Sequence, residues 1–166
     1  AFQHFRIDGE KAFRVYAAAQ ERDLFLTFHT GIHWHRISDY NVLLFDEVAY
    51  HFKNLRFSME HVGGYCFFLE ALAVMQNNQK DPPRIYAGLT SVSDKEGNHF
   101  WYQSDERLYE LLWQTGEDAS LFGLDFPYND AQKIQEAIAR IQGLDIPQTA
   151  KEKILGGNLR RVLSWD

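Results

Sequence analysis

The chain has 166 residues, 45% of them hydrophobic and 15% aromatic, and this composition predicts one globular domain spanning residues 1–166 rather than a disordered chain. No apolar run approaches the roughly 20 residues that a membrane-spanning helix needs, so no membrane partner is expected. The formal net charge of −6 and the lack of a basic stripe disfavour nucleic acid as a partner. Cys66 is the single cysteine and the first residues show no signal-peptide pattern, so the cytoplasm is the expected compartment.

Strand-like and helical segments alternate along the chain. Short apolar runs predict four strands, at residues 24–28, 56–59, 84–89 and 120–124. The first run is nearly all apolar, which is typical of a strand buried on both faces. Apolar residues at helical spacing predict helices before, between and after these strands. Strand and helix alternating four times indicate parallel strands with crossover helices. They fit either an open doubly wound sheet or half of an eight-stranded barrel.

Polar residues precede the predicted helices and are the expected N-caps. The first predicted helix covers residues 10–22, the third covers residues 67–76, and Gly143 is expected to close the helix that follows the fourth strand with a left-handed residue. The expected capping residues are Asp8, Ser38, Ser104, Asn129 with Gln132, Thr149 with Glu152, and Asn158.

Three strand ends carry residue types that bind metals. His29 follows the first strand, His61 the second and Asp125 the fourth. The carboxyl ends of adjacent parallel strands meet at one mouth, where two neutral imidazoles and a carboxylate can hold a divalent ion such as zinc. Asp125 could accept a proton from a metal-bound water, and His61 could polarise a carbonyl or move a proton. Each residue alone could instead be structural, through a hydrogen bond or a helix cap.

Aromatic residues near these strand ends are the candidates for substrate binding. Trp34 and Tyr128 are close in sequence to the proposed ligands, and Trp101 lies in a long polar and aromatic loop at residues 93–103. They could line a pocket for a small molecule, or pack over the rim of the sheet. Arg84 could bind a substrate carboxylate, but its position ahead of a strand favours a structural role.

Four segments together resemble the motifs of one known family. They are FHTG at 28–31, RFSMEHVGG at 56–64, LFGLDFPY at 121–128 and KILGGNLRRVLSW at 153–165. In that order they resemble the fifth-strand, sixth-strand and eighth-strand motifs and the closing helical segment of the amidohydrolase-related (amidohydrolase 2) metal-dependent hydrolases. The resemblance implies an α/β chain of the (β/α)8 TIM-barrel type that carries only strands 5–8, the C-terminal half of the barrel.

The resemblance also implies roles for individual residues. His29 and Asp125 would hold a divalent metal, expected to be zinc, with Asp125 as the proton acceptor. His61 would be a third ligand or a catalytic residue that polarises the substrate. The implied reaction is hydrolysis of a C–N or C–O bond in a small molecule, and the alternative within the family is non-oxidative decarboxylation of an aromatic or unsaturated acid.

One departure from the family pattern affects the metal site. The family carries an H-x-H pair at the end of its first strand, whereas the H-x-H of this chain, His33 to His35, follows the fifth and is interpreted as a loop facing substrate. A half barrel would also expose two sheet edges. A homo-oligomer, or association with the missing N-terminal half, is therefore expected. The rival readings are a catalytically incomplete assembly partner and a metal-free small-molecule-binding domain, although no glycine-rich phosphate loop supports the latter.

Overall fold

A parallel sheet of four strands forms the centre of the protein. The computed structural model describes residues 5–164. The strand order is β1-β2-β3-β4, and each strand pairs in parallel with the next strand along the chain. The strands are β1 Phe25–His29, β2 Arg56–Glu60, β3 Ile85–Gly88 and β4 Ser120–Leu121. The predicted alternation of parallel strands and helices is confirmed.

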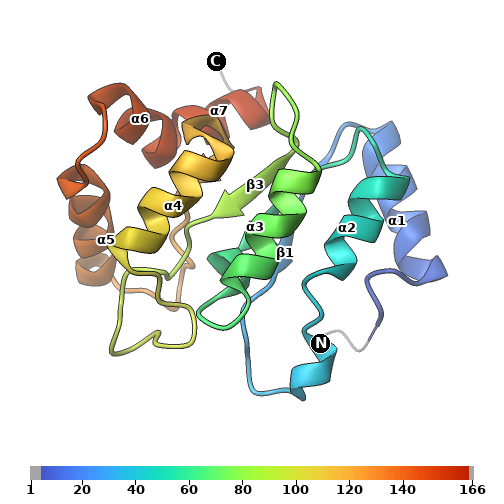
Figure 1. Cartoon of the computed structure of the whole chain (residues 1–166), viewed down its shortest axis with the longest axis horizontal. Helices are drawn as coiled ribbons and strands as arrows, with labels where there is room; N and C mark the ends of the chain where they lie inside the picture. Colours follow the sequence, from blue (N-terminus) through green and yellow to red (C-terminus); the bar gives the residue numbers. More distant parts are fainter. Residues whose placement is uncertain (1–4, 165–166) are drawn as a thin grey trace.

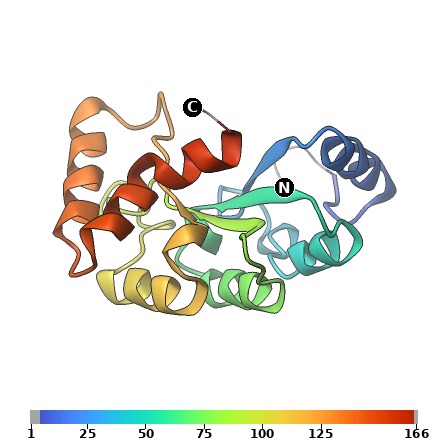
Figure 2. The same cartoon turned by 90° about the horizontal axis from the view of Figure 1, so that it is seen from above.

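Helices cover the sheet unequally. α2, α3 and α4 stand side by side on one face (Figure 1), and seen from above they lie on the opposite side of the strands from α7 (Figure 2). The helices are α1 Glu10–Glu21, α2 Leu44–His51, α3 Phe68–Asn77, α4 Asp105–Thr115, α5 Ala131–Gly143, α6 Gln148–Glu152 and α7 Asn158–Leu163. None of the helices in residues 5–164 has the length and apolar character that crossing a membrane requires.

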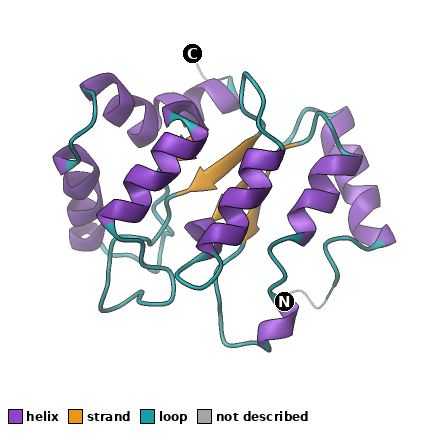
Figure 3. Ribbon diagram, viewed as in Figure 1, coloured by secondary structure: helices purple, strands orange, loops and turns teal. Residues whose placement is uncertain are grey.

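Residues on the two faces of the sheet belong to two separate hydrophobic clusters. Phe57 and Met59 of β2 are fully buried in the large cluster, which also contains the apolar faces of α2, α3 and α4. On the other face, Tyr86 of β3 and Leu121 of β4 pack against Val162 of α7. Because successive side chains of a strand point to opposite faces of the sheet, the two faces pack into different hydrophobic clusters. The long loops gather at the carboxyl ends of the strands (Figure 3).

β1 is an edge strand and is only partly covered. Leu26 and Phe28 pack against the large cluster, but Thr27 and His29 on the opposite face are exposed. The expectation that this run is buried on both faces is therefore wrong for the described chain. The reason is that β1 pairs with β2 alone, and the sheet order leaves its other edge without a strand.

β4 is shorter than predicted. Only Ser120 and Leu121 form the strand, because the next backbone N–H, that of Phe122, donates to the carbonyl of Ile154 at 3.0 Å rather than to the sheet. Asn158, expected as a helix cap, is instead fully buried. Its amide donates to the carbonyls of Glu117 at 2.7 Å and Ser120 at 2.9 Å, which ties α7 to the start of β4.

The expected helix caps are confirmed in one case. The hydroxyl of Ser104 accepts a hydrogen bond from the backbone N–H of Arg107 at 3.4 Å, as expected for α4. The caps expected for α1 and α2 are wrong, since Gly9 precedes α1 while Asp8 pairs with Arg6 at 2.6 Å. Ser38 lies in a separate 3-10 turn, Ile37–Asp39, so that α2 begins only at Leu44.

The caps expected in the C-terminal third are also wrong. Asp130 rather than Asn129 caps α5, accepting from the N–H of Lys133 at 2.9 Å. Gly143 is the last residue of that helix and is not left-handed. α6 follows Pro147 without a side-chain cap, so Thr149 has no capping role. Adjacent polar residues compete for the same N–H groups, and tertiary contacts decide between them.

Candidate metal centre at the carboxyl ends of the strands

Two of the predicted metal ligands face each other. His29 is the last residue of β1 and His61 directly follows β2, the neighbouring strand. Nδ1 of His29 and Nε2 of His61 are 3.2 Å apart. Two zinc–nitrogen bonds of about 2.0–2.1 Å in tetrahedral geometry place their nitrogens about 3.3 Å apart. The observed separation therefore fits two ligands of a single ion.

His61 is held in one ring tautomer. The residue is 3% exposed, and Nδ1 lies 2.7 Å from the backbone carbonyl of Thr90. A carbonyl oxygen only accepts hydrogen bonds, so Nδ1 carries the hydrogen and Nε2 presents its lone pair toward His29. Hydrogen bonding of the second ring nitrogen to a carbonyl is the usual way in which a protein orients a metal-binding histidine.

Both imidazoles are in the neutral form that metal binding requires. Burial lowers the pKa of His29 to about 4, with a further contribution from the neighbouring His61. His29 as a whole is exposed on the edge strand, but its imidazole contacts the rings of His33, His61 and Trp101. Burial also lowers the pKa of His61, and the negative charge of Asp125 opposes this effect at both histidines. Neither ring carries a proton charge near pH 7.

The depressed pKa of His29 makes stability depend on pH. The unfolded chain binds a proton at His29 near pH 6.5, whereas the folded chain does so only near pH 4. We therefore expect the free energy of unfolding to be fully retained above pH 6.5 and to fall as the pH is lowered from 6.5 toward 4. Guanidinium unfolding at pH 7.5 and 5.0 measures this loss. The loss of unfolding free energy should be smaller in His29→Asn. An equal loss in that variant would contradict the assignment of the low pKa to His29.

The indole ring of Trp101 packs against the imidazoles of His61 and His33. Its ring stacks on His61 with centroids 4.2 Å apart and 15° between planes, and on His33 at 5.8 Å and 18°. Its Nε1 donates to the carbonyl of Ile32 at 2.8 Å. Gly31 lies directly against this indole, where a Cβ would overlap the ring. The loop at residues 93–103 is thereby fixed onto the loop that follows β1.

The H-x-H segment after β1 also belongs to this cluster. The hydroxyl of Tyr40 accepts hydrogen bonds from the backbone N–H groups of His33 at 2.7 Å and His35 at 3.2 Å, which shapes the loop. The His33 ring meets His29 edge-on, with centroids 5.6 Å apart. The predicted position of this loop beside the site is consistent with that contact.

The other two predicted substrate-binding residues are exposed. Trp34 is 80% exposed and meets Phe100 edge-on with ring centroids 5.6 Å apart, while Tyr128 is 83% exposed. They follow β1 and β4, the two outer strands of the sheet. Their role in substrate binding stays a prediction.

Asp125 is held by a hydrogen bond from the loop after β3. It has a left-handed backbone, with φ of 53°, and its Oδ2 accepts a hydrogen bond of 2.7 Å from the hydroxyl of Ser91. Within residues 5–164, no three His, Cys, Asp or Glu side chains lie close enough together to hold a metal ion. The structure thus brings together two of the three predicted ligands, and the role of Asp125 as ligand and proton acceptor stays a prediction.

Residues after the third strand were missed by the sequence reasoning. The carbonyl of Thr90 orients His61, and its hydroxyl donates to Oε2 of Glu60 at 2.6 Å. Glu60 is the last residue of β2 and also receives a hydrogen bond from the hydroxyl of Ser58. Ser91 contacts Asp125. Their position after the buried strand β3 could have indicated them, as it did for His61. They were missed because serine and threonine are not metal-ligand types.

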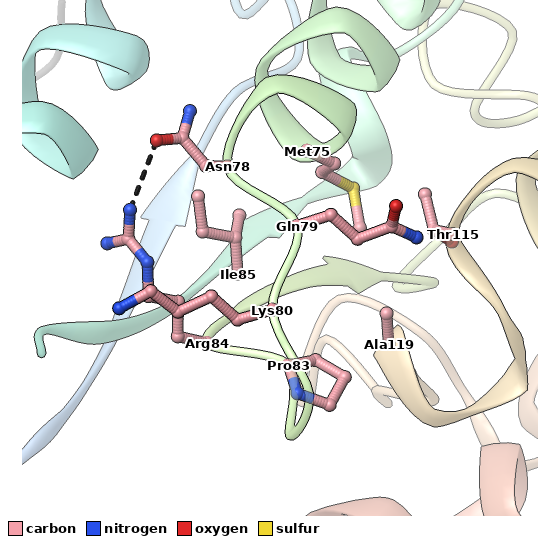
Figure 4. Close-up of a pocket in the computed structure, with 9 residues that line it drawn as sticks. All are labelled: Met75, Asn78, Gln79, Lys80, Pro83, Arg84, Ile85, Thr115 and Ala119. Atoms are coloured by element: carbon pink, nitrogen blue, oxygen red, sulfur yellow. Dashed lines mark hydrogen bonds between the residues drawn. The ribbon is translucent and has the colours of Figure 1, made fainter. Parts of the chain in front are cut away.

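A small cavity lies at the opposite ends of the strands (Figure 4). Its volume of about 20 Å³ is enough for about one water molecule. Arg84 at its edge donates to the carbonyls of Ala49 at 2.9 Å and Phe52 at 3.0 Å, and to Oδ1 of Asn78 at 3.1 Å. The expected structural role of Arg84 agrees with these contacts.

Parallel strands alternating with helices, with imidazoles at the carboxyl ends of the strands, define a chain of the TIM-barrel type. The chain matches the family described as Amidohydrolase (Amidohydro_2) over residues 1–165, and it belongs to that family. The family contains metal-dependent hydrolases and decarboxylases. A comparison with curated proteins finds no match.

Solved structures confirm the predicted fold class. An uncharacterized TIM-barrel protein from Bordetella bronchiseptica is 20% identical with a TM-score of 0.77, and the match covers 96% of this chain and 52% of that one. A zinc-bound amidohydrolase from Burkholderia multivorans is 13% identical with a TM-score of 0.69, covering 95% and 58%. The 5-carboxyvanillate decarboxylase of Sphingomonas paucimobilis is 17% identical with a TM-score of 0.67, covering 96% and 55%. The chain therefore spans about half the length of these structures.

Proposed function

We propose that the protein is the metal-binding C-terminal half of an amidohydrolase-family enzyme that hydrolyses a C–N or C–O bond in a small molecule. One observation carries this proposal, namely the 3.2 Å approach of two neutral imidazole nitrogens at neighbouring strand ends. The zinc-bound Burkholderia structure has the same fold and supports the choice of zinc. Imidazole nitrogens are also ligands that suit zinc better than magnesium or calcium.

Each residue of the centre has a separate task in this proposal. His29 through Nδ1 and His61 through Nε2 would hold the ion, and Asp125 would be the third protein ligand. A bound divalent ion polarises a substrate carbonyl and lowers the pKa of its water. Asp125 would accept the proton of the attacking water, and His61 would assist at the metal, because its other ring nitrogen is hydrogen-bonded to the carbonyl of Thr90. Trp34, Trp101 and Tyr128 would line the substrate side of the mouth.

Decarboxylation of an aromatic or unsaturated acid is the second candidate reaction. The similarity to 5-carboxyvanillate decarboxylase favours it. The two reactions differ in product, because hydrolysis consumes water across a C–N or C–O bond whereas decarboxylation releases carbon dioxide. Turnover of the same purified protein on aryl esters, lactones and hydroxybenzoic acids separates the two candidates.

A partner would complete the centre. Within residues 5–164 two candidate ligands face each other but no group of three could hold a metal ion, and the chain spans about half of the similar barrels. A second copy of this chain, or the N-terminal half of the barrel, would cover the open edge of β1 and add ligands. An incomplete assembly partner without activity of its own is the alternative reading. We place the protein in the cytoplasm as part of the same proposal.

Zinc affinity tests the centre without requiring a known substrate. We expect His29→Ala to weaken zinc binding at least about tenfold, because it removes one of the two facing nitrogens. Competition with a chromophoric chelator measures the dissociation constant, and native mass spectrometry reports zinc and partner mass together. The matched control is His99→Ala, since His99 is exposed and contacts Phe100. Equal zinc affinity in wild type, His29→Ala and His99→Ala would contradict the proposal.

A further inference from the structure

A line of hydrogen bonds ends on the carboxylate of Asp125. The amide Nδ2 of Asn129 donates to Oγ of Ser91 at 2.8 Å, and the Ser91 hydroxyl donates to Oδ2 of Asp125 at 2.7 Å. Ser91 lies in the loop after β3, Asp125 lies in the loop after β4, and Asn129 directly precedes the α5 cap. Their contacts join two loops that are more than 30 residues apart in sequence.

The direction of each hydrogen bond follows from the chemistry of the groups. An ionised carboxylate only accepts, so the single hydrogen of the Ser91 hydroxyl is directed to Asp125. Ser91 can then only accept from Asn129, whose second amide hydrogen is directed to the carbonyl of Leu124 at 3.0 Å. The carbonyl acceptor fixes the amide orientation of Asn129, and the amide in turn fixes the hydroxyl of Ser91.

The backbone at both ends of this contact is unusual. Ser91 has φ of 56° and Asp125 has φ of 53°, a left-handed conformation that residues other than glycine rarely adopt. Such conformations persist where surrounding contacts hold them, and they concentrate at functional sites. In this case they bring the Ser91 hydroxyl and the Asp125 carboxylate together.

Only one carboxylate oxygen of Asp125 takes part. Within residues 5–164, Oδ2 accepts the Ser91 hydroxyl, and Oδ1 has no hydrogen-bond donor. Resting on the proposed function, we propose that Ser91 is a positioning residue for Asp125, that Asn129 positions Ser91, and that together they leave Oδ1 as the oxygen presented to the metal centre. The hydrogen bond orients the carboxylate.

Ser91→Gly is the informative variant. Glycine adopts a left-handed backbone without strain, so this change removes the hydroxyl while retaining the fold. We expect zinc affinity to fall about tenfold, the usual effect of removing a group that orients a ligand. A role limited to loop conformation would leave zinc affinity unchanged, because glycine satisfies that conformation.

A double-mutant cycle reports the same contact without metal. Ser91→Gly, Asp125→Ala and the double variant are unfolded in guanidinium under metal-free conditions. We expect the effect of Ser91→Gly on the unfolding equilibrium constant to differ at least about tenfold between the wild-type and Asp125→Ala backgrounds, as for a hydrogen bond to a charged group. Additive effects would overturn the proposal.

Ser164→Gly is the matched control. Ser164 also has a left-handed backbone, with φ of 52°, at the end of α7. It should have wild-type zinc affinity. Wild-type zinc affinity in Ser91→Gly, alongside weakened binding in Asp125→Ala, would overturn the proposal. A wild type that binds no zinc contradicts the proposed function instead, and the cycle then decides whether Ser91 holds Asp125.

Discussion

Gly64→Ala is expected to destabilise the protein by about 3 kcal/mol. Gly64 follows the turn that carries His61 and has φ of 65° and ψ of −166°, a region that is essentially restricted to glycine. A Cβ would also lie 2.7 Å from the backbone carbonyl of Phe100. That oxygen belongs to the backbone of the loop at residues 93–103, which would have to move. Chemical denaturation of the variant measures the loss.

Alanine variants at two other glycines separate the cost of backbone strain from the cost of a steric contact. Gly116 has φ of 78° and ψ of 161°, but no atom of the described chain lies within 4 Å of the position that a Cβ would take, so Gly116→Ala should lose only the cost of backbone strain. Gly143 at the end of α5 has neither problem, and Gly143→Ala should be neutral or slightly stabilising. A Gly64→Ala loss no greater than that of Gly116→Ala would contradict the close approach of Phe100.

Trp101→Ala is also expected to destabilise the protein by about 3 kcal/mol, within the usual range for truncating a packed tryptophan. The variant loses the stack on His61 and His33 and the hydrogen bond to Ile32. Since these contacts connect the loop at residues 93–103 to the loop after β1, hydrogen exchange in both loops should accelerate. Denaturation and hydrogen-exchange mass spectrometry measure the two effects.

Trp101→Phe separates the ring from the indole N–H. It keeps an aromatic ring against His61 but removes the donor to Ile32, and it should lose about 1 kcal/mol. Trp113 on α4 is 80% exposed, so Trp113→Ala should change stability by less than about 0.5 kcal/mol. If Trp101→Ala were as mild as Trp113→Ala, the indole would not hold the two loops together.

Much of the fold followed from residue patterns. The short runs that contain Phe57 and Ile85 marked two of the four strands, because their apolar residues bury against the helices. The helical spacing of Leu108 and Leu111 marked α4 for a similar reason. The edge position of β1 could not be predicted in this way, since a run such as the one around Phe28 looks the same whether or not a second neighbour pairs with it.

The candidate site was predicted in part. His29 and His61 were selected because they follow neighbouring strands, and the structure places their nitrogens 3.2 Å apart. Asp125 was selected by the same argument and is held by Ser91, but within residues 5–164 the three residues do not form a group that could hold a metal ion. The contacts of Thr90 and Ser91 were missed, because serine and threonine after a strand are common and carry no metal-binding signature.

The sequence by itself determined the alternation of strand and helix, the family and the three chemically competent strand ends. Those properties depend on residue type and local spacing, which a linear pattern records. Only the tertiary structure decided which caps form and that the Trp101 ring stacks on His61 and His33. It also decided that Asn129 donates a hydrogen bond to Ser91, which in turn donates one to Asp125. Such contacts join segments far apart in the chain, and several polar residues could have satisfied each local requirement equally well.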